Sequence, residues 1–124
     1  MPWTDDELSR VGRAEELRIA SYRPDGSLRP YVTIWAVRAG DDLYVRSAYG
    51  AGNGWFRRAK ASGSGRIQAG GVERDVTFAG AEPGAHVGID EAYHRKYDRY
   101  GPAIVGSVTG DEARAVTIRL RPTD

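Results

Sequence analysis

The segment from Arg46 to Arg58 contains residue types that can bind a phosphate group. Arg46 and Ser47 end a β-rich run, and three glycines follow at positions 50, 52 and 54. Glycines let backbone N–H groups approach a ligand closely, and a helix starting at Trp55 would add free donors and a partial positive charge. The spacing therefore predicts a phosphate-binding loop, although it matches neither a Walker loop nor a dinucleotide fingerprint. The alternative is a flexible surface loop followed by a solvated basic helix.

The run from Tyr31 to Trp35 is a second candidate for ligand binding. Aromatic residues stand here beside the β-branched residues Val32, Thr33 and Ile34, and such a strand could form one wall of a slot for a planar ring. The alternative is an ordinary core strand in which Trp35 packs inside.

Residue types for acid–base, nucleophilic or metal chemistry are sparse. His86 and His94 are the only histidines, cysteine is absent, and no Gly-x-Ser-x-Gly elbow occurs. A zinc site needs three or four convergent ligands, so no metal site and no catalytic residue are assigned. Tyr93, Tyr97 and Tyr100 recur at helical spacing, which predicts a core-facing stripe rather than a set of proton donors.

Composition limits the class of protein. The 124 residues suit one domain, residues 1–124, and the 18 basic and 17 acidic residues nearly cancel to a net charge of +1. That balance does not favour nucleic-acid binding, and no window approaches the roughly 20 apolar residues of a membrane span. Without cysteine or a recognisable leader, a cytoplasmic protein is expected.

Periodicity predicts a mainly β chain with flanking helices. Alternating apolar residues and Gly/Pro/Asp turns indicate six antiparallel strands. The expected strands are residues 17–22, 28–37, 43–48, 66–69, 72–78 and about 113–120. The expected helices are a first one ended by Gly12, a second over residues 55–61, and a third capped by Asp90 and ended or kinked by Gly101–Pro102. Strands joined mainly by hairpins favour a closed or nearly closed barrel over the alternative, a two-layer α+β sheet.

The order of these elements resembles the split-barrel fold of flavin-binding proteins related to pyridoxamine phosphate oxidase. Within it, the chain is most similar to small deazaflavin-dependent nitroreductases and to an uncharacterised family of similar short chains. The similarity extends over about residues 17–78 and the last strand, so it implies a six-stranded antiparallel split barrel. The residues that carry it are Asp25-Gly26, Pro30, Thr33-Ile34-Trp35, Leu43 to Ser47, Gly50 to Gly54, Trp55-Phe56 with Arg58, and Arg66 to Gly71.

This resemblance implies a site, a cofactor and a partner. In such families the ring lies along the second strand, and the phosphate meets the third strand and the following loop. The residues that would edge the ring are Thr33, Ile34 and Trp35; those that would hold the phosphate are Arg46, Ser47, Gly50, Asn53 and Arg58; Trp55 is a further cofactor-binding residue. The implied cofactor is a deazaflavin coenzyme or FMN, and a second subunit often completes the cleft, so a homodimer is expected.

The implied activity is that of a flavin- or deazaflavin-dependent oxidoreductase acting on a small molecule. The cofactor carries the hydride in such enzymes, so the absence of a catalytic triad does not argue against it. The alternative is a non-catalytic split-barrel module that binds or sequesters a flavin-like or other planar ligand.

Overall fold

The computed structural model describes residues 2–123, which form seven strands packed with helices. The strands are β1 (Leu17–Ser21), β2 (Val32–Ile34), β3 (Ala36–Ala39), β4 (Asp42–Arg46), β5 (Ser64–Ala69), β6 (Val72–Ala79) and β7 (Thr117–Pro122). The α-helices are α1 (Asp5–Arg13), α2 (Gly54–Ser62), α3 (His86–Tyr97), α4 (Pro102–Gly106) and α5 (Asp111–Arg114). Two 3-10 helices, η1 (Pro83–Ala85) and η2 (Asp98–Tyr100), precede and follow α3.

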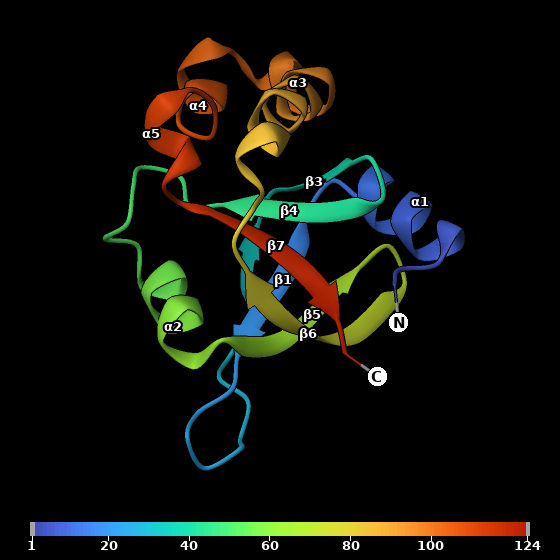
Figure 1. Ribbon diagram of the computed structural model, residues 1–124, viewed down its shortest axis with the longest axis vertical. Coiled ribbons are helices and arrows are strands. Elements are labelled where there is room, and N and C mark those ends of the chain that lie inside the picture. Colours follow the sequence, from blue (N-terminus) through green and yellow to red (C-terminus); the bar gives the residue numbers. More distant parts are fainter. Residues whose placement is uncertain (1, 124) are drawn as a thin grey trace.

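The strands form one antiparallel sheet that curls into a nearly closed barrel (Figure 1). Its order is β2-β1-β5-β6-β7-β4-β3, so β2 and β3 are the two edges. Only Trp35 separates these edge strands along the chain, and one bent segment therefore pairs with β1 at one end and with β4 at the other. The mainly β barrel is confirmed, but the prediction of six strands is wrong, because the single strand expected over residues 28–37 changes partners at Trp35.

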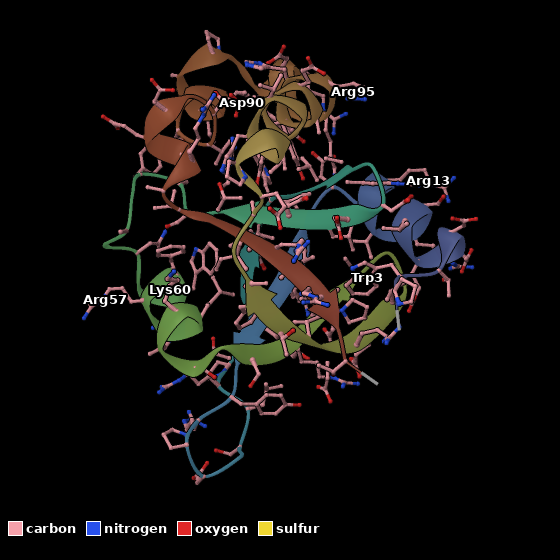
Figure 2. All side chains as sticks on the ribbon, in the orientation of Figure 1. Trp3, Arg13, Arg57, Lys60, Asp90 and Arg95 are labelled. Atoms are coloured by element: carbon pink, nitrogen blue, oxygen red, sulfur yellow. The ribbon has the colours of Figure 1, made fainter. Side chains whose placement is uncertain are left out.

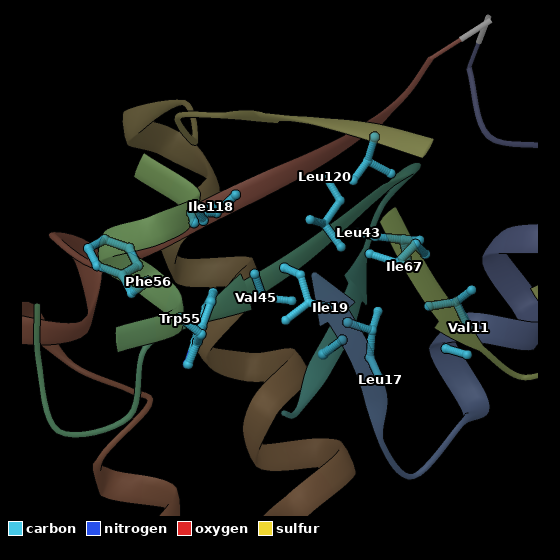
Figure 3. Packing of buried hydrophobic residues seen from close by; sticks show 14 of the residues in the cluster. Val11, Leu17, Ile19, Leu43, Val45, Trp55, Phe56, Ile67, Ile118 and Leu120 are labelled. Carbon is cyan, nitrogen blue, oxygen red and sulfur yellow. The ribbon is translucent and has the colours of Figure 1, made fainter. Parts of the chain in front are cut away.

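The barrel interior holds the larger apolar core (Figure 3). Alternate residues of the strands point inward, as the side-chain period of two requires. Helices α1 and α2 cover the ends of this core, which contains Leu8, Val11, Leu17, Ile19, Leu43, Val45, Trp55, Phe56, Ile67, Val76, Ile118 and Leu120. Burial of these apolar side chains is the main contribution to the stability of the fold, since each Å² of apolar surface removed from water contributes about 25 cal/mol.

Two glycines permit close backbone approaches at the barrel ends. A Cβ at Gly65 would lie 2.0 Å from the carbonyl oxygen of Ala20, where β5 crosses β1. Gly70 has a φ of +57° in the β5–β6 turn, and a Cβ there would lie 2.3 Å from the carbonyl oxygen of Arg10 in α1. Any larger residue at either position would push the backbones apart.

Helix α1 begins as the sequence predicts and runs further than predicted. Thr4 and Glu7 form a reciprocal cap, with Glu7 N donating to Thr4 Oγ1 at 3.1 Å and Thr4 N donating to Glu7 Oε1 at 3.0 Å. Gly12 does not end the helix, which continues to Arg13. A Cβ at Gly12 would lie 3.1 Å from Cβ of Arg38, so this glycine lets α1 pack closely on β3.

A second apolar core lies outside the barrel, between β3–β4 and the helices that follow β6. Val37 and Tyr44 point outward from the barrel and meet Ile89, Tyr93 and Tyr97 of α3. The predicted tyrosine stripe is thus confirmed as core for Tyr93 and Tyr97, which are fully buried, but is wrong for Tyr100, which lies in η2 and is 47% exposed. Within the described residues, no helix is long and apolar enough to cross a membrane.

The start of α3 corrects a prediction. Asp90 was expected to cap the helix, but α3 begins at His86 and Asp90 lies inside its second turn. The carboxylate of Asp90 instead pairs with Arg46, which lies far away in the sequence. A long-range ion pair of this kind leaves no local signature, whereas an aspartate before a periodic run does resemble a cap.

Candidate functional site

A cavity of about 310 Å³, termed the apolar cleft, opens beside β2. Its walls come from β2 and Trp35, the 47–53 loop, the start of α2, and the segment from α4 to residue 108. The lining residues are Val32, Thr33, Ile34, Trp35, Arg46, Ala48, Tyr49, Asn53, Trp55, Ile104, Ser107 and Val108. Six of the nine sequence-predicted binding residues therefore meet in one cavity: Thr33, Ile34, Trp35, Arg46, Asn53 and Trp55.

Trp35 is held in place by the tyrosines behind it. Its ring stacks on Tyr97 with centroids 4.0 Å apart and planes 6° apart, and Tyr100 lies 5.4 Å away at a tilt. The Tyr97 hydroxyl lies 3.0 Å from the carbonyl oxygen of Glu15 and 3.1 Å from that of Ala36. The stacking fixes the orientation of the indole that lines the cleft.

Arg46 is buried, and protein groups engage its guanidinium. It pairs with Asp90, donates from Nη1 to the Val108 carbonyl at 2.9 Å, and donates from Nε to Thr117 Oγ1 at 2.9 Å. Nη2 lies 3.2 Å from Nδ1 of His86. These contacts tie β4 to α3, to Val108 and to the first residue of β7, so Arg46 is a paired structural cation beside the cleft rather than a source of free donors.

His86 fits this arrangement as a neutral imidazole. Burial lowers its pKa, and the charges of Arg46 and Arg114 lower it further, while Asp90 opposes them. A neutral Nδ1 without a proton can accept a hydrogen bond from the guanidinium of Arg46. His86 thus completes the network around Arg46 and does not line the apolar cleft.

Ser47 and Gly50 lie next to the cleft rather than in it. The Ser47 hydroxyl donates to the Gly50 carbonyl at 2.6 Å, and Gly50 N donates to the Ser47 carbonyl at 3.3 Å. Both line a neighbouring hollow that also contains Asp111 and Glu112. These two residues therefore bond to each other within the loop. The negative charges of Asp111 and Glu112 beside them disfavour a phosphate in this hollow.

Arg58 lines a different cavity, termed the arginine groove. The groove has a volume of about 770 Å³ and runs between α2 and the loop after β1. Four arginines line it, and among the described residues it has no acidic lining residue. Its lining residues are Tyr22, Arg23, Pro24, Arg29, Gly54, Arg57, Arg58, Ala61, Ser62 and Ser64.

A small hollow of about 10 Å³ lies between the apolar cleft and the arginine groove. It shares Val32 and Trp55 with the cleft, and Arg29 and Arg58 with the groove. The predicted ring-binding residues and Arg58 thus line neighbouring cavities on either side of the start of α2.

Several lining residues were not found from the sequence. Arg23 and Arg29 flank a turn and belong to no recognisable motif. Two arginines on either side of a Pro-Asp-Gly turn do, however, indicate local positive charge. Ile104, Ser107 and Val108 reach the cleft only because α4 folds back over the barrel. No pattern in the sequence indicates that contact.

No group of three or more His, Asp or Glu residues that could hold a metal ion occurs within residues 2–123.

Comparison with known families decides the classification. Residues 7–120 match a family described as "uncharacterized protein conserved in bacteria (DUF2255)". The chain belongs to this family. No curated protein matches the sequence significantly.

Several solved structures share the fold of this family member. An F420 reductase is 20% identical with a TM-score of 0.58, and the match covers 98% of this chain and 97% of that one. A putative pyridoxamine 5'-phosphate oxidase from Listeria innocua is 12% identical with a TM-score of 0.64, covering 97% and 93%. An FAD-binding protein from Mesorhizobium loti is 17% identical with a TM-score of 0.55, covering 100% and 93%. These similarities show that the chain shares the fold of these proteins.

Proposed function

We propose that this protein binds a flavin-type cofactor, with the flat ring in the apolar cleft and the phosphate-bearing tail over the arginine groove. The observation that carries this proposal is that the two cavities are neighbours, because one small hollow between them shares Val32 and Trp55 with the cleft and Arg29 and Arg58 with the groove. A ligand that is planar and apolar at one end and anionic at the other matches both surfaces. The fold similarity to F420-, FAD- and pyridoxamine-phosphate-related proteins supports the same class of ligand.

The cleft suits the ring in shape and chemistry. Its volume of about 310 Å³ is at the small end for ligand sites, which typically span roughly 300–1,000 Å³. Most of its lining is aliphatic or aromatic, and Thr33, Asn53 and Ser107 supply a few hydrogen-bonding groups. Such a site would hold a ring by burial and orient it by its polar edge.

The start of α2 suits the phosphate. Asn53 precedes the helix but makes no side-chain hydrogen bond to its first amides. The guanidinium of Arg58 lies close to Gly54: a Cβ built on Gly54 would lie 2.9 Å from Nη1 of Arg58. Free N–H groups, the helix dipole and a guanidinium thus converge between cleft and groove, which favours an anionic group there.

The groove favours a deazaflavin coenzyme of the F420 type over FMN. Arg23, Arg29, Arg57 and Arg58 supply more positive charge than one phosphate requires. A longer polyanionic tail would use this charge through charge-assisted hydrogen bonds.

The activity we propose is that of an oxidoreductase acting on a small molecule. When bound, a flavin or deazaflavin supplies hydride transfer, and the protein supplies orientation and exclusion of water. Here Trp35, fixed by Tyr97, would orient the ring, and Ile104 and Val108 of the covering segment would limit access of water.

A non-catalytic carrier is the second candidate. The polar groups Thr33, Asn53 and Ser107 in the cleft are poor proton donors and acceptors near neutral pH, which fits binding without turnover. The spectrum and mass of the small molecule that co-purifies with the protein test the binding proposal, which a colourless preparation that takes up no added flavin would contradict. Turnover with the reduced cofactor then separates the enzyme from the carrier.

We also propose a homodimer whose second copy covers the mouth of the cleft. Tyr49 is 81% exposed, and Ile104 is 41% exposed, at the rim of the same cavity. Exposed apolar residues beside one cavity are typical of an interface, and two-fold dimers are the commonest soluble assembly. Light scattering that returned a 13.6 kDa particle at micromolar concentration would contradict it.

A further inference from the structure

A further cavity lies on another side of the barrel, between α1, β3 and α3. It has a volume of about 270 Å³ and is termed the cationic hollow. Its lining residues are Leu8, Ser9, Gly12, Arg13, Val37, Arg38, Ala92, Arg95 and Lys96. None of them lines the apolar cleft or the arginine groove, so the proposed cofactor site does not account for this hollow.

Four cationic side chains converge on the hollow from three separate elements. Arg13 comes from the end of α1, Arg38 from β3, and Arg95 and Lys96 from the last turn of α3. Figure 2 shows Arg13 and Arg95 on the same side of the molecule. The elements are distant in sequence, so the positive charge is gathered by the fold.

The charge in the hollow is poorly neutralised by the protein. Within residues 2–123, neither Arg13 nor Arg95 forms an ion pair. Arg38 donates from Nε to the Gly40 carbonyl at 2.9 Å, and its one ion-pair contact is a loose one of 3.9 Å with the exposed Asp41. Glu15, a nearby carboxylate, is paired with Arg99. Acidic residues are absent from the lining among the described residues.

Lys96 makes the hollow more than a patch of surface arginines. Its ammonium is partly buried, donates to the Ala36 carbonyl at 2.7 Å, and lies 5.1 Å from the centre of the Tyr97 ring. Burial lowers its pKa to about 8; the charge of Arg99 acts in the same direction, and that of Glu15 opposes it. A lysine held in this way lacks a compensating anion, since a carbonyl and an aromatic face carry no full negative charge.

We propose that the cationic hollow binds a small multivalent anion, namely the phosphate or carboxylate groups of a small metabolite. The four cations from three elements would each contribute to one compact anion, and its binding would relieve their mutual repulsion. The volume admits a ligand of this size and is too small for a dinucleotide.

The test is a titration of the ¹⁵N-labelled protein with inorganic pyrophosphate, followed residue by residue by NMR. Amides of Gly12, Val37 and Ala92 report on the hollow, whereas those of Gly54 and Ala61 report separately on the arginine groove. We expect saturable shifts at the hollow that sodium chloride of equal ionic strength does not reproduce. A parallel titration with citrate distinguishes phosphate from carboxylate ligands, and saturation by either supports the proposal.

Variants make the test specific. Arg38→Gln and Arg95→Gln should each raise the dissociation constant at the hollow at least fivefold, whereas the exposed Arg18→Gln on β1 should leave it unchanged. The proposal is overturned if the hollow amides fail to saturate with both anions, or if all three variants bind as the wild type does. Because the titration needs no flavin, its outcome is independent of the proposed cofactor.

Discussion

The indole of Trp35 stacks on the phenol ring of Tyr97, with their planes only 6° apart. Trp35 is the residue at which the edge strand changes partners, and Tyr97 is the last residue of α3. The stack therefore joins the bend of the barrel to the helices packed outside it. It also links the two cavities of interest, since Trp35 lines the apolar cleft and Lys96, next to Tyr97, lines the cationic hollow.

Tyr97→Phe should lower the free energy of unfolding by about 1–3 kcal/mol, because it removes a hydroxyl that bonds buried backbone groups. That hydroxyl contacts the carbonyls of Glu15 and Ala36 and accepts from Ala36 N at 3.3 Å. Urea unfolding measures the change. The matched control is Tyr100→Phe, whose exposed hydroxyl contacts only Arg99; an equal loss in both variants would contradict this role of Tyr97.

Asp90→Asn should destabilise the protein by about 3 kcal/mol, because it leaves the buried guanidinium of Arg46 without its counter-ion. Combining it with Arg46→Met removes the charge as well, so the double variant should lose less stability than the sum of the two single variants. The control is Asp111→Asn, which breaks only an exposed pair with Arg114 and should cost under about 0.5 kcal/mol. Additive losses at positions 46 and 90 would argue against the buried pair.

Stability should rise with pH just above pH 8 because of Lys96. The folded protein holds the pKa of Lys96 at about 8, below the ordinary value of 10.5. Between these values the unfolded chain binds more protons, so raising the pH favours the folded state. Tyr93 and Tyr97, whose pKa values are raised, act in the opposite sense only above the ordinary tyrosine value of 10.0.

Urea midpoints collected from pH 8 to about 9.5 measure this dependence. Lys96→Met should flatten the rise, while Lys60→Met, an exposed lysine on α2, should keep it. The same rise in wild type and Lys96→Met would show that another group titrates.

The arginine groove should contribute affinity for an anionic tail. Arg29→Gln and Arg58→Gln each remove a donor at the junction of groove and cleft, so each should weaken binding of a deazaflavin coenzyme roughly tenfold, or by about 1.4 kcal/mol. The affinity for riboflavin, which has no phosphate, should be the same in both variants as in the wild type. Equal losses of affinity for riboflavin and for the coenzyme would show that the groove does not bind the anionic tail.

Much of the barrel could be predicted from the sequence because its signals are local. The Gly70-Gly71 turn and the alternation along β5 and β6 define a hairpin from neighbouring residues alone. The tyrosines at positions 93 and 97 define the buried face of α3 by their helical spacing. Six of the predicted binding residues line one cavity because they lie on or beside strands and a helix whose order the sequence predicts.

Other features depend on contacts between distant residues and could not be predicted. The edge strand breaks at Trp35 because each half pairs with a different strand, and no local pattern marks the exchange. Arg46 looked like a phosphate ligand, but its donors go to Asp90, Val108 and Thr117, whose positions only the complete fold defines. The same holds for the cationic hollow, where four cations from three elements converge.

The apolar cleft should bind the ring of a flavin-type cofactor. A fluorescence titration of the apoprotein with a deazaflavin coenzyme, FMN and FAD tests this binding most directly. We predict saturable binding of at least one of them with a micromolar or lower dissociation constant. Ile104→Glu, which places a carboxylate at the rim of the cleft, should weaken that binding at least tenfold, or by about 1.4 kcal/mol. Val87→Glu, on an exposed position of α3 outside the cleft, should bind normally. Failure of all three cofactors to bind, or equal binding by wild type and Ile104→Glu, would contradict the account.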